Sequence, residues 1–132
     1  MAWFADLTTY TYSSWAPEPN TVNIGWLDSE HPYPQGKTNA EFQDRLTFFC
    51  ENPPEPFATM GFHECEFCGK VLGGNEIRII AKNKTYAAPV LVFHYVIAHA
   101  YRPPDEFIEA VMKAPAPSSH EMVSRYGSPL PH

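Results

Sequence analysis

The sequence predicts one small α+β domain with a few short strands and about three helices. Its 132 residues are 44% hydrophobic and 14% aromatic, which is enough apolar surface for one compact core. Segments with the two-residue period of strands and segments with the period of helices both occur along the chain. Fourteen prolines against seven glycines indicate short elements joined by extended connections.

The first half of the chain is expected to hold one strand and one helix. Residues 21–27 alternate apolar with polar side chains, as a half-buried strand does. Thr38 followed by Glu41 resembles a capping box, and apolar side chains then recur at helical spacing, which predicts a helix over residues 39–51. The prolines within residues 52–56 end this helix and form a stiff connector.

The second half is expected to hold a hairpin and two helices. Residues 73–75 predict a turn, and the Ile-rich strand after it returns through residues 82–84 to give a hairpin near 76–86. Pro89 suits the first position of a helix over residues 89–101, which is apolar on nearly every side and should be the buried centre of the domain. A last helix begins at Pro104, with acidic residues in its first turn and a lysine in its last.

We expect the globular domain to span residues 1–113. Residues 114–132 hold four prolines, several serines and few large apolar side chains. Such a composition buries too little surface to offset the entropy of ordering. This Pro-rich C-terminal tail is therefore predicted to be mobile or draped over the domain.

Charge and cysteine content exclude several classes of protein. Nine basic against fifteen acidic residues give a net charge of −6, and without a basic cluster nucleic-acid binding is disfavoured. The start of the chain lacks the basic region of a secretory signal, and no apolar run is long enough to cross a bilayer. An odd cysteine count of three argues for reduced thiols, so we expect a cytoplasmic protein.

Cys65 and Cys68 form the most informative motif, a Cys-x-x-Cys turn that we call the knuckle (residues 65–68). Two thiolates from nearby positions reach one metal ion only if the backbone folds back within four residues, and this spacing does so. Gly69 follows directly and can adopt a positive φ that turns backbone amides towards the sulfurs. The motif predicts about one zinc ion per chain.

Histidines are the expected remaining ligands. His63 lies two residues before Cys65, on the same side of an extended chain, and is a plausible third ligand. His94 and His99 lie on the central helix, where five residues leave them about 140° apart, so one helix should not offer both to one ion. His99 is slightly preferred as the fourth ligand, with His94 as the alternative or as a core histidine.

Other interpretations of these residues remain open. The two cysteines could be small buried thiols without a metal, or redox-active, although neither a strand before the motif nor a helix directly after it is predicted. His63 is about as easily explained as a hydrogen-bonded loop histidine. Cys50 is expected to be a small buried apolar residue rather than a ligand.

Several short motifs occur together within residues 22–113. They are Gly25-Trp26-Leu27, His31-Pro32-x-Pro34-x-Gly36, Gly61-Phe62-His63-x-Cys65-x-x-Cys68, Tyr86-x-Ala88-Pro89 and His94-Tyr95-Val96-x-x-His99-x-Tyr101-x-Pro103-Pro104-x-x-Phe107. Their combination resembles a family of small uncharacterised bacterial proteins. The resemblance implies a shared fold and a shared cluster of cysteines and histidines, but no substrate.

Three functions compete. The first is a non-catalytic zinc-stabilised domain that binds another protein, with His63, Cys65, Cys68 and His99 as a closed structural site. The second is a zinc-dependent hydrolase with one open metal position and Glu64 or Glu66 as the base. The third, a nucleic-acid-binding zinc ribbon, is disfavoured by the charge of −6. A domain without metal is a further alternative.

Overall fold

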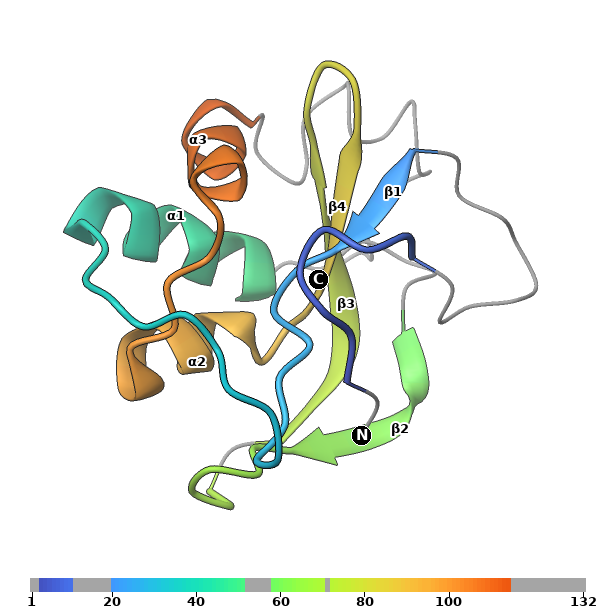
Figure 1. Cartoon of the computed structure of the whole chain (residues 1–132), viewed down its shortest axis with the longest axis vertical. Coiled ribbons are helices and arrows are strands. Elements are labelled where there is room, and N and C mark those ends of the chain that lie inside the picture. Colours follow the sequence, from blue (N-terminus) through green and yellow to red (C-terminus); the bar gives the residue numbers. More distant parts are fainter. Residues whose placement is uncertain (1–2, 11–19, 52–57, 71, 115–132) are drawn as a thin grey trace.

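A four-stranded sheet with three helices on one side makes up the part of the chain that the structure describes (Figure 1). The structure is a computed structural model and describes residues 3–10, 20–51, 58–70 and 72–114, without the side chains of 58–63 and 72–75. The expected α+β class is confirmed. None of the helices in these ranges has the length and apolarity needed to cross a bilayer.

The elements follow one another in mixed order along the chain. They are β1 (Thr21–Asn23), α1 (Ala40–Glu51), β2 (Ala58–Glu64), β3 (Leu72–Ile80), β4 (Thr85–Pro89), α2 (Val92–His99) and α3 (Asp105–Lys113). The strand order is β1-β4-β3-β2, in which β1 runs parallel to β4 and the other neighbours are antiparallel. The chain therefore passes from the β3–β4 hairpin directly into α2.

The two faces of β3 are buried in different ways because its side chains alternate. Ile77 and Ile79 belong to the main core, which the helices complete. On the opposite face, Arg78 donates a hydrogen bond to Glu76 at 2.9 Å and its guanidinium lies 4.7 Å from the centre of the Tyr10 ring. Tyr10 also donates to Glu76 at 2.8 Å. The buried charges are thus paired and hydrogen-bonded, as burial requires.

The segment before β1 is attached to the sheet by long-range contacts. Asp6 accepts hydrogen bonds from the Tyr101 hydroxyl at 2.8 Å and from the Gly25 amide at 3.0 Å. Burial raises the pKa of Asp6, and these two donors partly offset that rise. Residues far apart in sequence therefore fasten the start of the chain to the sheet and to the segment after α2.

The strand predicted over residues 21–27 is shorter than expected. β1 ends at Asn23, and Gly25 then adopts a φ of 73°, outside the strand region. A Cβ atom at Gly25 would lie only 2.6 Å from Cγ2 of Val92, so glycine is needed for close approach to α2 as well as for the backbone angle.

The predicted turn at residues 73–75 is wrong, and β2 was not expected. Residues 73–75 lie inside β3, where Asn75 pairs with Ala58 and Gly73 pairs with His63. An irregularity in register between Ala58 and His63 obscures the strand pattern of β2. The hairpin predicted near 76–86 is present as the β3–β4 pair, but β3 starts earlier and pairs with β2 as well.

The central helix is shorter than the predicted span of 89–101 and is exposed on one side. Pro89 ends β4 instead of opening the helix, and β1 pairs with β4 only as far as Ala87, so Pro89 lies beyond that ladder. Along α2, Tyr95 and Val96 are buried, whereas Ile97 is 54% exposed. The prediction of a helix buried nearly all round is therefore wrong for this face.

The helix predicted over residues 39–51 is confirmed as α1, but with a different capping residue. The Asn39 side chain accepts a hydrogen bond from the Phe42 amide at 2.7 Å, which is the N-cap geometry. The Thr38 hydroxyl instead accepts from the Gln43 side chain at 3.0 Å. The expected capping role of Thr38 is thus taken by its neighbour.

Substituting the capping residue should have a measurable cost. Asn39→Ala removes the acceptor of the Phe42 amide and should lower the free energy of unfolding by about 1 kcal/mol. Thr38→Ala, which leaves the cap in place, is the matched control and should cost clearly less. Urea unfolding of both variants measures the difference, and a larger cost for Thr38→Ala would contradict this assignment.

Candidate metal centre

The knuckle lies at the tip of the hairpin formed by β2 and β3. Glu64 pairs with Leu72 at the end of the ladder, and the chain turns between them. Gly69 has a φ of 67°, and its amide donates to the Cys65 carbonyl at 2.7 Å. The hairpin thus supplies the tight turn that the Cys-x-x-Cys spacing requires.

Cys65 is the buried member of the pair. Its side chain is fully buried, whereas Cys68 is partly exposed. Burial raises the pKa of the Cys65 thiol, although the backbone amides of Cys68 and Phe67 donate to its sulfur and act against that rise. Amides directed at a sulfur are the arrangement that stabilises a bound thiolate.

The two histidines of α2 meet the knuckle. His94 lies in the first turn of α2 and His99 is its last residue. The Cys65 sulfur is 3.4 Å from Nε2 of His99, and the Cys68 sulfur is 3.4 Å from Nε2 of His94. The two Nε2 atoms are 3.2 Å apart. One donor atom from each of the four residues lies within 4.8 Å of every other, which makes them a cluster that could hold one metal ion.

These distances match the edges of a zinc tetrahedron. With zinc bonded to sulfur and nitrogen at its usual lengths, sulfur and nitrogen ligands lie about 3.6 Å apart and two nitrogens about 3.3 Å apart. The observed edges of 3.4 Å and 3.2 Å are within a few tenths of an ångström of these values. These three edges therefore suit zinc, and the other pairs of donor atoms lie within 4.8 Å of each other.

The expectation that α2 could not offer both histidines to one ion is wrong. The two Nε2 atoms are 3.2 Å apart and the ring centroids 4.9 Å apart. At the end of α2 the Ala100 and Tyr101 amides both donate to the Tyr95 carbonyl, which differs from the regular bonding of an ideal α-helix. The backbone rotation alone also leaves out the length of the two imidazole side chains.

His63 lies in β2, just before the knuckle. Its backbone belongs to β2, but its side chain lies outside the described residues, so its expected role as a ligand stays a prediction. The four donors that come together are Cys65, Cys68, His94 and His99.

Aromatic residues hold the cluster in place. The Phe67 ring, within the knuckle, lies 5.1 Å from the His99 ring and 5.2 Å from the Tyr33 ring, measured between centroids. The Tyr33 hydroxyl donates to the His99 carbonyl at 2.9 Å. These contacts fix the end of α2 against the knuckle. Burial lowers the pKa of His94, with a smaller contribution from His99, and so favours the neutral imidazole that a metal requires.

The two carboxylates beside the knuckle lie close to residues outside the cluster. Glu66 accepts hydrogen bonds from the Ser29 amide at 3.2 Å and from its hydroxyl at 3.1 Å. A carboxylate oxygen of Glu64 would lie 3.2 Å from a Cβ atom built on Gly69, so this side chain covers the glycine. Neither carboxylate contributes an atom to the cluster.

Cys50 is separate from the cluster and has a different role. It is 7% exposed at the end of α1, as expected for a small buried residue. Burial raises the pKa of its thiol, and the backbone amide of Phe93 donates to its sulfur. Because Phe93 lies in the first turn of α2, Cys50 satisfies one of the amide groups that a helix leaves unpaired there. No pattern in the sequence indicates this contact.

The fold and the cluster together define a small α+β domain in which a hairpin knuckle meets two histidines of one helix. The profile of the family described as "Domain of unknown function (DUF7919)" matches residues 2–112, and the chain belongs to this family. This membership agrees with the expected resemblance to an uncharacterised family. Comparison with curated proteins gave no match, and comparison with solved structures gave none either.

Proposed function

We propose that the domain binds one zinc ion through Cys65, Cys68, His94 and His99 and that the ion is structural. The observation that carries this proposal is the approach of four donor atoms to within 4.8 Å of one another. Two thiolates and two imidazoles favour zinc among the common divalent metals. Four protein ligands fill a tetrahedral shell, which is typical of structural sites and leaves no position for a reacting water.

The ligand set differs from the one that the sequence favoured. His94 takes the place of His63 because its Nε2 atom lies among the other three donors. The proposed ion would join the β2–β3 hairpin to α2, and a link of this kind stabilises both elements at once. In this proposal the domain serves as a non-catalytic module that binds another protein. The net charge of −6 disfavours nucleic acid as the partner, and a closed metal shell would leave no position for a reacting water.

The hydrolase alternative depends on an open metal position. It requires that one of the four donors stay unbound and that Glu64 or Glu66 approach a zinc-bound water. The contact of Glu66 with Ser29 and the absence of both carboxylates from the cluster favour the structural role.

Metal analysis of the protein purified without chelator should find about one zinc per chain. X-ray absorption at the zinc edge should then report two sulfur and two nitrogen ligands. An oxygen ligand in addition to three protein ligands would favour the hydrolase. Folded protein that contains no metal and takes up none when zinc is added would overturn the proposal.

A further inference from the structure

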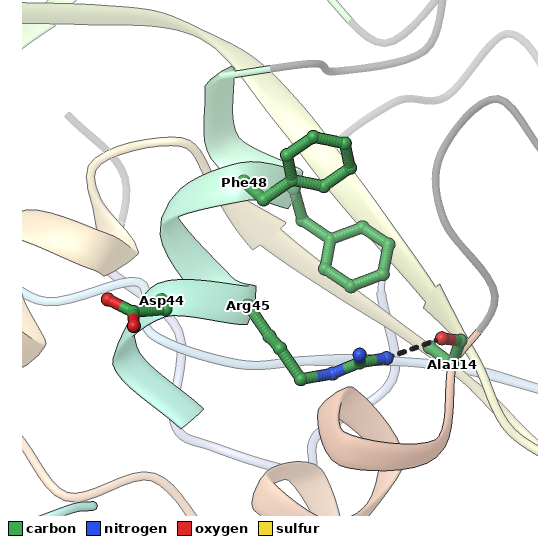
Figure 2. A pocket seen from close by; sticks show the side chains of 5 residues that line it. Asp44, Arg45, Phe48 and Ala114 are labelled. Atoms are coloured by element: carbon green, nitrogen blue, oxygen red, sulfur yellow. Dashed lines mark hydrogen bonds between the residues drawn. The ribbon is translucent and has the colours of Figure 1, made fainter. Parts of the chain in front are cut away.

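A groove lies between α1 and the end of α3, away from the metal centre. It has a volume of about 330 Å³ and is lined by Asp44, Arg45, Phe48, Phe49 and Ala114. Figure 2 shows the Phe48 ring on one side and Ala114 with the Arg45 side chain on the other. Phe48 is 50% exposed, so an aromatic surface borders the groove.

The residue at which the chain leaves α3 is fixed against this groove. The Arg45 guanidinium donates to the Ala114 carbonyl at 2.7 Å and to the Val111 carbonyl at 2.9 Å. Ala114 is 5% exposed and has a φ of −69° and a ψ of 145°, the backbone angles of polyproline II. The exit of the chain from α3 is therefore extended and held in place.

The next residues have the composition that such a groove accepts. Pro115, Ala116 and Pro117 follow Ala114 directly. Proline-rich segments favour polyproline II and dock in grooves lined by aromatic side chains, because their conformation is largely fixed before binding. Because this segment is joined directly to Ala114, which lines the groove, its effective concentration at the groove is high.

We propose that residues 115–117 dock in the groove between α1 and α3 and contact Phe48. The first residues of the tail would thereby be bound to the surface formed by α1 and α3. Phe48 supplies the apolar contact, Arg45 fixes the preceding carbonyl, and the two prolines keep the segment extended. This site is independent of the proposed zinc ion.

Backbone relaxation of the full chain labelled with ¹⁵N tests the docking. The amide of Ala116 should have an order parameter near the rigid value of about 0.85, and Phe48→Ala should lower it below about 0.6. Ile97→Ala is the matched control, because Ile97 is 54% exposed but lies on α2, and it should leave Ala116 rigid. Unchanged amide signals of β3, β4 and α2 away from the groove would show that Phe48→Ala still folds.

Contacts between protons identify the occupant directly. Nuclear Overhauser effects from the Phe48 ring to Pro115 or Pro117 within one chain support the proposal. A mobile Ala116 in the unmodified protein would overturn the proposal. So would Overhauser effects from the Phe48 ring to residues 52–57 in place of the tail. Effects that occur only between differently labelled copies would assign the groove to a second molecule and overturn it as well.

Discussion

Cys65→Ser and Cys68→Ser should each release the zinc and lower the melting temperature by roughly 10–20 °C. The estimate follows from a loss of about 3–5 kcal/mol, a fraction of the 10–16 kcal/mol with which structural sites hold zinc. In the proposed site each thiolate would connect the hairpin tip to α2, and its loss would leave three ligands and an unfilled position. Calorimetry together with metal analysis of the purified variants measures both effects.

Cys50→Ser is the control for this experiment. Cys50 is as well buried as many core residues but lies outside the cluster. Its serine variant can still accept the Phe93 amide, so it should retain zinc and lose only about 1 kcal/mol. Equal losses of stability for all three cysteine variants would mean that burial, not ligation, explains the importance of the knuckle.

His94→Ala and His99→Ala should each weaken zinc binding by more than about 100-fold. Changes to residues that merely orient a ligand cost 10–100-fold, and removal of a ligand should exceed this range. The two Nε2 atoms are 3.2 Å apart and each lies 3.4 Å from a sulfur, so neither histidine can replace the other. Competition with a chromophoric zinc chelator measures the affinity.

Four further variants sharpen this result. His31→Ala removes an exposed histidine that pairs with Asp28 and should leave affinity unchanged. His99→Cys should restore binding, because zinc also accepts three thiolates and one imidazole. His63→Ala should retain zinc, and release of the metal by this variant would place His63 in the shell. Full retention of zinc in the double variant of His94 and His99 would remove α2 from the site.

The helices were the part of the fold that could be predicted from local patterns. The apolar spacing in α1 and the charge order of α3 are properties of short windows, so these two elements have nearly the expected bounds. By contrast, β2 and the start of β3 depend on pairing with each other across the knuckle. Such pairing between strands is not visible in the residues of one strand.

The cysteines of the site could be predicted, but the pair of histidines could not be derived from ideal helix geometry. The end of α2 is closed by the amides of Ala100 and Tyr101, which lie beyond the helix itself. A signal was nevertheless present, because structural zinc sites often space two histidines three to five residues apart after a Cys-x-x-Cys. His94 and His99, with four residues between them, fit that spacing.

The segment before β1 also affects how the molecule meets other copies of itself. Leu7, Thr8 and Tyr10 form hydrogen bonds with the outer side of β1, through the Asn23 carbonyl, the Asn23 amide and the Thr21 carbonyl respectively. An edge strand with open donors and acceptors is a template for aggregation by strand addition. Because these three groups of β1 are already bonded within the chain, this end of the sheet is protected against pairing with a neighbouring molecule.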